Sequence, residues 1–355
     1  MSGKRSATLK EANHMGPTTD CADHGNGRRK FLARGAAFGA AALVLPRPAA
    51  AEPPPEIRKI RLVHAPAICL SPQYLAEELL RAEGFSEVEY VELTTNTVGG
   101  AIAGGLADLS MDATTELIPL IDSGERVVVL AGVHAGCYEL FGNARVKAVR
   151  DLKGRTVSIT EERSPEHVYI SSIVAYVGMN PLKDIAWMNA KSSADAMQLF
   201  IDGKADAFLG FAPQPQELRA RKIGRVIVNT TLDRPWSQYF CCSVAANRDF
   251  VVRNPVATKR ALRAILKAAD ICTQDPQRAA RMLQVKGYEP RYEIGLEVLK
   301  SLPYRRWREA NPEDTIRFHA LRLHEVGMIK TNPNKLIAQG TDWRFLNELK
   351  RELKA

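Results

Sequence analysis

Short runs rich in Val, Ile and Leu alternate along the chain with longer segments whose apolar residues recur every three or four positions. Runs of the first kind are typical of strands, and segments of the second kind are typical of amphipathic helices. In the first part of the chain the pattern predicts four strands separated by three helices. The strands cover residues 59–64, 88–93, a short run after Gly105, and 127–131; the helices cover residues 73–83, 97–103 and about 115–124.

The same alternation continues through the middle of the chain and then gives way to helices alone. Strands are predicted at residues 156–159, 185–188, 207–211 and 226–228, with helices at 165–177, 194–201 and 214–221. One more apolar strand, at 239–246, precedes helices at 255–273, 276–285, 292–301, 312–326 and 343–353. This order predicts an α/β fold with a helical C-terminal tail.

One short segment occurs twice in the sequence. Gly105-Leu-Ala-Asp108 and Gly203-Lys-Ala-Asp206 each follow a helix-like run and lead into an apolar strand that breaks into a polar or proline-rich loop. Because glycine commonly ends a helix, both copies predict a helix that ends at the glycine and is followed by a strand and then a loop. An α/β unit used twice indicates two similar α/β lobes with facing loops.

Length and composition are those of a globular protein that is large enough for two domains. The chain has 355 residues, of which 45% are hydrophobic and 25% are charged, and a domain usually holds ~100 to 200 residues. More than half of the net charge of +9 comes from residues 1–51, which hold eight Lys or Arg and three Asp or Glu. The remaining 41 basic and 37 acidic residues leave a balance of +4, which argues against a nucleic-acid-binding protein.

The first 51 residues have the pattern of an export signal. The basic group Arg28-Arg29-Lys30 precedes an apolar run over residues 35–45, and Ala49-Ala50-Ala51 follows it. These are the three parts of a secretory signal, so we expect cleavage near Ala51 and a periplasmic location. The arginine pair resembles the twin-arginine type. A membrane anchor is the weaker interpretation, because the apolar run is about half of the ~20 residues that span a bilayer.

Five short motifs follow the signal in a characteristic order: Pro72-Gln-Tyr-Leu-Ala-Glu77, Gly105-Leu-Ala-Asp108, Asp151-Leu-Lys-Gly154, Gly203-Lys-Ala-Asp206 and Asn254-Pro255. In this order and spacing the chain resembles the extracytoplasmic substrate-binding proteins of ABC importers in the nitrate, taurine and alkanesulfonate group. That group also includes binders of thiamine-precursor pyrimidines. The resemblance covers roughly residues 60–269.

The resemblance implies a periplasmic-binding-protein-like fold of the type II arrangement, in which two crossover strands join two α/β lobes and the ligand binds between them. The crossovers are expected near residues 138–143 and 236–244. The implied domains are a signal peptide at 1–51, the first part of lobe 1 at 52–141, lobe 2 at 142–238, and a return to lobe 1 with C-terminal helices at 239–355. The implied function is capture of a small organic ligand for delivery to an ABC permease and its ATPase.

Candidate ligand contacts follow from the loops at the strand ends. In open α/β sheets, ligands bind beyond the carboxyl ends of the strands, and a cleft between lobes closes on them by a hinge. The candidates in the first lobe are Ser71, Gln73, Thr114, Thr115 and His134. Those in the second lobe are Ser164, His167, Phe211 and Gln214, with Trp236 and Tyr239 beside the return crossover.

Most of these candidates also have a structural alternative. Helix capping is the alternative for Thr114, Thr115 and Ser164. Packing in the core or at the hinge is the alternative for Phe211, Tyr138, Trp236 and Tyr239. His134 lies in a loop flanked by glycines, which favours ligand contact over a buried structural role.

The charge of the ligand stays open. Helix N-termini at the cleft favour a sulfonate or carboxylate, each by about 0.3 to 1 kcal/mol. Acidic side chains crowd the same loops and oppose an anion: Asp112, Glu116, Glu161, Glu162 and Glu166. A pyrimidine-like ligand and an aromatic acid therefore stay open as alternatives.

Five cysteines follow the signal, and their spacing does not match a zinc motif. Cys137 and one of the adjacent Cys241 and Cys242 lie on the predicted crossovers, where a disulfide is possible, but buried unpaired thiols are the favoured state. We therefore expect no metal and no cofactor.

The sequence also lacks the short motifs of common enzyme classes, including the Gly-x-Ser-x-Gly elbow and the P-loop. We therefore predict that the protein is not an enzyme. Two alternatives stay open. One is an enzyme on the same fold, related to those of thiamine-pyrimidine or menaquinone synthesis, since a fold does not determine function. The other is a ligand-sensing partner of a membrane receptor.

Overall fold

A computed structural model describes residues 52–65, 67–93 and 97–354. Residues 53–355 form one compact unit, and the predicted signal peptide lies outside the described residues. Within the described part of the chain, no helix is both long enough and apolar enough to cross a membrane.

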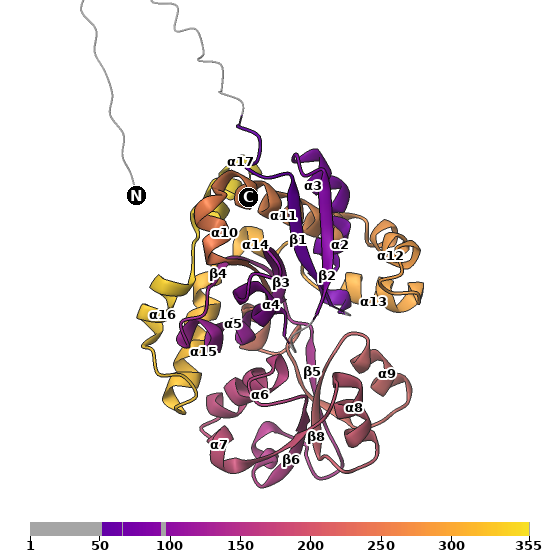
Figure 1. The fold of residues 1–355 in the computed structure, drawn as a ribbon. Coiled ribbons are helices and arrows are strands. Elements are labelled where there is room, and N and C mark those ends of the chain that lie inside the picture. Colours follow the sequence, from indigo (N-terminus) through magenta and orange to yellow (C-terminus); the bar gives the residue numbers. More distant parts are fainter. Residues whose placement is uncertain (1–51, 66, 94–96, 355) are drawn as a thin grey trace, which may run out of the picture. The chain divides into compact units, whose positions relative to one another are not determined.

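The first lobe is built on five strands. β1 (Lys59–His64) pairs in parallel with β2 (Glu87–Glu92), and β10 (Phe240–Asn247) lies between β3 (Leu109–Ala113) and β4 (Val127–Ala135), antiparallel to both. The helices that connect these strands are α2 (Ser71–Leu75), α3 (Glu77–Ala82), α4 (Val98–Ala103) and α5 (Thr114–Asp122), with the short 3-10 helix η1 (Ile68–Leu70) after β1 (Figure 1).

The second lobe contains one five-stranded sheet. Its strand order is β7 (Ile185–Asn189), β6 (Arg155–Ile159), β8 (Ala207–Phe211), β5 (Tyr138–Gly142) and β9 (Arg225–Asn229). The first three strands run parallel, and β5 is antiparallel to both of its neighbours. The lobe also contains η2 (Val149–Leu152), α6 (Pro165–Tyr176), α7 (Pro181–Asp184), α8 (Ser193–Ile201) and α9 (Gln214–Ala220).

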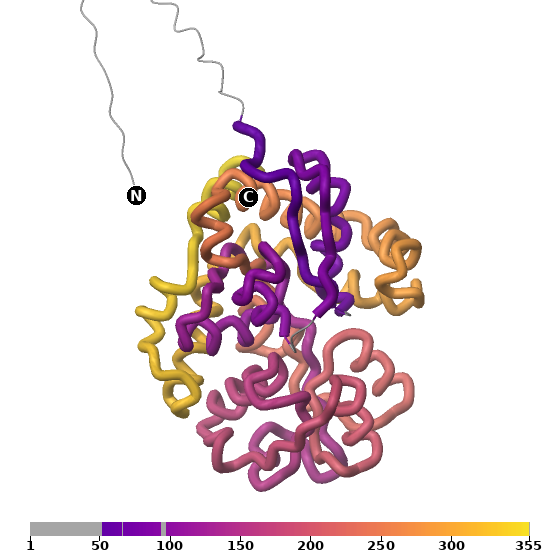
Figure 2. The backbone as a smooth tube through the Cα atoms, viewed as in Figure 1, coloured from indigo at the N-terminus to yellow at the C-terminus, as the bar shows by residue number. Residues whose placement is uncertain are grey.

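Two connections join the lobes, as predicted. The chain passes from β4 to β5 through Gly136 and Cys137, and it returns from β9 to β10 through η3 (Trp236–Gln238). Figure 2 shows the second lobe in magenta to salmon. These colours follow the indigo and purple of the first lobe along the sequence and precede the orange and yellow of the C-terminal part. The predicted domain boundaries at residues 141 and 238 fall close to these connections, and they stay predictions. Residue 141 lies within β5, which pairs with strands of the second lobe's sheet.

The C-terminal part is helical, as predicted, and it contacts both lobes. It comprises α10 (Arg248–Arg253), α11 (Pro255–Gln274), α12 (Pro276–Val285), α13 (Tyr292–Ser301), α14 (Arg306–Glu309), α15 (Pro312–Glu325), α16 (Pro333–Gly340) and α17 (Arg344–Glu352). α11 packs against α2 and α3, whereas α15 packs against α5 of the first lobe and α6 of the second. His319 on α15 and Ser172 on α6 are joined by a buried hydrogen bond of 2.8 Å.

The repeated Gly-x-Ala-Asp segment has the same structural role in both lobes. Asp108 accepts a hydrogen bond from the Arg61 backbone N–H at 2.8 Å, and its own N–H donates to the Arg61 carbonyl at 2.9 Å. Asp206 makes the equivalent pair with Thr156, at 3.1 Å and 2.7 Å. Each aspartate therefore ties the start of one strand to the start of another strand of its lobe.

Candidate functional site

A cavity of about 470 Å³ lies between the two lobes and is lined by both. Residues at the carboxyl ends of five strands contribute to its wall. Ala65 follows β1, Thr160 follows β6 and Ala190 follows β7, while Ala113 and Phe211 are the last residues of β3 and β8. The cavity is therefore at the carboxyl ends of the strands, where open α/β sheets bind ligands.

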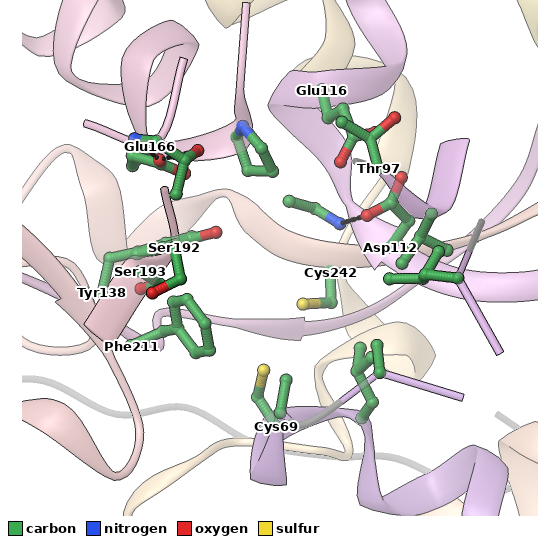
Figure 3. A pocket seen from close by; sticks show the side chains of 18 of the residues that line it. Cys69, Thr97, Asp112, Glu116, Tyr138, Glu166, Ser192, Ser193, Phe211 and Cys242 are labelled. Carbon is green, nitrogen blue, oxygen red and sulfur yellow. Dashed lines mark hydrogen bonds between the residues drawn. The ribbon is translucent and has the colours of Figure 1, made fainter. Parts of the chain in front are cut away.

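Two carboxyl groups, Asp112 and Glu116, form one side of the cavity (Figure 3). Asp112 lies one residue before the end of β3 and Glu116 lies in the first turn of α5, which brings the two side chains together, 4% and 3% exposed. Asp112 Oδ1 accepts a hydrogen bond from the Ala113 N–H at 2.7 Å, and Glu116 Oε1 accepts one from the Gly99 N–H at 3.2 Å. The oxygens Oδ2 and Oε2 receive no hydrogen bond from an N–H or hydroxyl group of the described residues.

Burial makes this carboxyl pair hold a proton near neutral pH. Burial raises the pKa of Asp112 well above its usual value, and the neighbouring Glu116 carboxylate raises this pKa further. Burial also raises the pKa of Glu116 from 4.5 to about 7. A group that brings positive charge or N–H donors into the cavity would supply the missing partners and favour the ionised pair.

The opposite wall comes from the second lobe and is partly aromatic. Tyr138 and Phe211 meet edge to face, with ring centroids 6.0 Å apart. Glu166 is turned to its own lobe, since its Oε1 accepts hydrogen bonds from the Thr160 N–H at 2.6 Å and the Thr160 hydroxyl at 2.5 Å. Ser192 and Ser193 add hydroxyl groups beside Phe211 (Figure 3).

A cluster of thiols forms part of the cavity wall and extends behind it. Cys69 and Cys242 line it, and their sulfur atoms lie within 4.8 Å of each other and of a ring nitrogen of His134. Cys137, Cys241 and Cys242 form a second group with the same spacing. The five cysteines of the described residues are unpaired and buried, as the sequence favoured. Hydrogen bonds from the thiols of Cys137 and Cys242 lower the pKa of Cys69 well below its usual value.

All five first-lobe candidates are buried, and none of them lines this cavity. The Gln73 amide donates to the Val63 carbonyl at 2.8 Å and accepts from Ser110 Oγ at 2.9 Å. The Thr114 hydroxyl is paired with that of Ser243 at 2.7 Å. Ser71, Thr115 and His134 are also buried, and His134 lies within β4 rather than in the predicted loop. Ligand contact at these residues stays a prediction.

Some of the second-lobe candidates line the cavity, and others hold neighbouring residues in place. Phe211 lines the cavity, and Gln214 orients the lining residue Ser193 through a hydrogen bond of 2.9 Å from its amide to the serine hydroxyl. Ser164 caps α6 by accepting the His167 N–H at 3.4 Å. Trp236 packs edge to face on Phe318 at 5.6 Å, and Tyr239 stacks on the same ring at 4.0 Å. These contacts match the structural alternatives considered for Ser164, Trp236 and Tyr239, and their contact with ligand stays a prediction.

Several lining residues were not among the candidates. The loop from Ala190 to Ser193 follows a predicted strand, so the strand-end rule would have included it. For Asp112 and Glu116 the sequence indicated only an effect on the charge of the ligand. Cys69 and Cys242 carried no local signal, because their partners are far away in the sequence.

We expect Phe211→Ala to weaken ligand binding at least about tenfold while costing the ligand-free protein under about 1.5 kcal/mol, since the ring is only partly buried. Phe208→Ala on the same strand is the matched control, because Phe208 is 1% exposed and truncation of a buried Phe costs about 3 to 5 kcal/mol. Calorimetric affinity and urea unfolding measure the two effects. A loss of several kcal/mol in Phe211→Ala with unchanged affinity would make Phe211 a core residue.

Acidification should destabilise the protein through His167. Burial and the positive charge of Arg163 lower the pKa of His167 from 6.5 to about 4, so between these values the unfolded chain binds a proton that the folded chain does not. Stability is therefore lost as the pH falls, by about 2 kcal/mol between pH 7 and pH 5 for this group. His167→Gln should lose correspondingly less over this range in urea unfolding, whereas a His324→Gln control at an exposed site should behave like the wild type. Equal losses in all three proteins would contradict this assignment.

Comparison with known proteins gives one family and a large set of similar structures. The model of the NMT1-like family matches residues 100–286, and no curated protein sequence matches the chain. The periplasmic nitrate-binding protein NrtA from Synechocystis PCC 6803 is similar at a TM-score of 0.71 and 16% identity, over 85% of this chain and 90% of NrtA. The alkanesulfonate-binding protein SsuA from Xanthomonas axonopodis pv. citri, bound to MOPS, is similar at 0.64 and 17%, over 81% of this chain and 99% of SsuA.

An enzyme also has this architecture. A cysteine-to-serine variant of DszB in complex with biphenyl-2-sulfinic acid is similar at a TM-score of 0.54 and 15% identity, over 83% of this chain and 100% of DszB. At these identities the likenesses establish the fold, which is the predicted periplasmic-binding-protein fold. They leave the ligand to be inferred from the cavity itself.

Proposed function

The chain belongs to the NMT1-like family, and from that premise we propose that it is an extracytoplasmic solute-binding protein of an ABC importer. The observation that carries the proposal is the cavity between two lobes at the carboxyl ends of their strands. Pockets of roughly 300 to 1,000 Å³ suit small organic ligands. The periplasmic nitrate-binding and alkanesulfonate-binding neighbours have the same architecture.

The ligand that suits this cavity best carries N–H donors. Asp112 and Glu116 present oxygens without N–H or hydroxyl partners among the described residues, and an amine or an amino-substituted heterocycle would donate to them. Tyr138 and Phe211 supply aromatic surface opposite, which suits a flat ring. Among the expected classes, this favours a pyrimidine-like ligand over a sulfonate or carboxylate. Lys191 is the lining residue that would favour an anionic group.

A thermal-shift screen followed by calorimetry tests the proposal, because a ligand that binds the native state raises its melting temperature with concentration. Aminopyrimidines, aliphatic amines, sulfonates, carboxylates and nitrate are compared at pH 6 and pH 8. Binding of the N–H donors should strengthen as the pH rises through about 7, since the ionised carboxyl pair is then more populated. If sulfonates alone stabilise the protein, its ligand is a sulfonate and not a pyrimidine-like N–H donor. If none of these compounds stabilises it, the result counts against solute binding.

Delivery of the ligand implies an ABC permease with its ATPase as partners and the periplasm as the location. The export signal predicted at residues 1–51 supports this location. Replacing both Arg28 and Arg29 by Lys should leave unprocessed precursor in the cytoplasm if the twin-arginine route is used, as immunoblots of cell fractions would reveal. Unchanged processing would indicate the general secretory route instead.

An enzyme on the same fold is the second candidate function. The observation that favours it is the combination of Cys69 and Cys242 with two carboxyl groups in one cavity, together with the structural likeness to DszB. Incubation of the protein with each stabilising ligand, followed by mass spectrometry, separates the two functions. Recovery of unchanged ligand favours binding, and multiple turnovers favour the enzyme.

A further inference from the structure

Three side chains from separate parts of the chain converge at the wall of the cavity. Cys69 lies on η1, His134 on β4 and Cys242 on β10. Their two sulfur atoms and one ring nitrogen all lie within 4.8 Å of one another, and all three residues are buried. Cys69 and Cys242 also line the cavity (Figure 3), so the cluster has access to whatever enters there.

The hydrogen bonding of His134 is that of a histidine whose Nε2 is available to a metal ion. Its Nδ1 lies 3.1 Å from the Gly136 carbonyl oxygen, which accepts the Nδ1 proton and so leaves a lone pair on Nε2. The ring is fully buried, and Nε2 has no hydrogen-bond partner among the described residues. A histidine ligand generally donates its other N–H to a carbonyl or carboxylate, which holds the tautomer and the ring in place. Tyr304 packs against this ring edge to face, at 5.1 Å between centroids.

We propose that Cys69, His134 and Cys242 bind one thiophilic metal ion of the Zn²⁺ class at the wall of the cavity. Two thiolates and one imidazole are a donor set that Zn²⁺ favours. Tetrahedral bonds of ~2.3 Å to sulfur and ~2.0 Å to nitrogen place neighbouring donor atoms about 3.5 to 3.8 Å apart, so only a small contraction of the observed spacing is needed.

Charge balance suits this buried position. Binding replaces the thiol protons of Cys69 and Cys242, which leave as two hydrogen ions, and the two thiolates neutralise the two charges of Zn²⁺. A neutral complex avoids the cost of an uncompensated charge in the protein interior. Three protein ligands leave a fourth coordination position, and two of the three ligands, Cys69 and Cys242, line the cavity. A small ligand or a water molecule would complete the coordination there.

Cobalt binding by the reduced, metal-free chain tests the proposal, because Co²⁺ reports tetrahedral thiolate ligation by its visible absorption. The wild type should bind one Co²⁺ per chain with thiolate-to-metal charge-transfer bands, and Zn²⁺ should displace it. Cys69→Ser and Cys242→Ser should each lose at least about 100-fold in affinity, and His134→Gln at least about tenfold. Cys272→Ser is the matched control, since Cys272 is a buried thiol on α11 that belongs to neither cysteine group; it should bind as the wild type does.

Unchanged affinity in Cys69→Ser and Cys242→Ser, or no Co²⁺ binding by the reduced wild type, would overturn the proposal. A disulfide within the cluster in the exported protein would overturn it as well. If the variants fail to fold, X-ray absorption of the zinc-loaded wild type decides: two sulfur donors with one imidazole support the site, and a shell of nitrogen and oxygen alone refutes it. These measurements need no organic ligand, so they are independent of the proposed solute binding.

Discussion

Asp112→Asn and Glu116→Gln are each expected to weaken ligand binding by about 10- to 100-fold, because a hydrogen bond to a charged group contributes about 1.5 to 3 kcal/mol. Both replacements keep the shape of the side chain, and both keep an oxygen to accept the existing hydrogen bonds from Ala113 and Gly99. What they remove is the anionic oxygen that would receive a donor from the ligand.

The same replacements should stabilise the ligand-free protein above neutral pH. The folded protein raises the pKa of Glu116 to about 7, so this group contributes stability below pH 4.5 that is lost as the pH rises through 7. By pH 8 the loss amounts to about 3 kcal/mol, and a neutral glutamine does not suffer it. A replacement that raises the stability of the ligand-free protein and lowers its affinity for the ligand is expected at a residue whose role is ligand binding.

Urea unfolding at pH 6 and pH 8, with calorimetry on a ligand from the screen, measures both effects. Glu125→Gln is the control, because Glu125 is an exposed carboxylate just beyond the same helix; it should leave affinity and stability unchanged. A variant of Asp112 or Glu116 that loses stability and keeps its affinity would make the pair structural.

Gly136→Ala is expected to destabilise the protein by about 2 to 5 kcal/mol, through backbone strain and overpacking together. Gly136 lies in the first connection between the lobes and has a φ of +68°. A Cβ atom there would lie 2.4 Å from the Cα of Thr231 and 2.3 Å from its hydroxyl oxygen. Because the obstacle includes backbone, side-chain rotation alone cannot relieve it.

Gly154→Ala separates the cost of backbone strain from the cost of overpacking. Gly154 has a similar φ of +70°, but no atom lies within 4 Å of the position that an alanine methyl group would occupy, so only the strain of about 1 to 2 kcal/mol remains. Urea unfolding of the two variants under the same conditions gives the difference. Equal costs at both positions would mean that the connection adapts and that the close approach to Thr231 is not restrictive.

The sequence alone determined the elements and their order, because those depend on neighbouring residues. The predicted helices at 276–285 and 292–301 agree with α12 and α13 at both ends, since local signals define them: the Asp275 carboxylate, for example, accepts the Arg278 N–H at 3.0 Å and caps α12. The two-lobed α/β fold and the position of the cavity at strand ends followed from the same kind of pattern. The predicted helix at 73–83 was less accurate, because the structure divides it into α2 and α3.

Only the tertiary structure decided which side chains of the strand-end loops reach the cavity. Gln73 on α2 and Thr114 at the start of α5 follow the ends of β1 and β3 along the chain, yet long-range partners hold them inside: Ser110 lies 37 positions from Gln73, and Ser243 lies 129 from Thr114. The cluster of Cys69, His134 and Cys242 has no sequence signal for the same reason, since it depends on β10 pairing next to β4. Local periodicity assigns a residue to an element, whereas the direction of its side chain depends on packing between elements that are far apart along the chain.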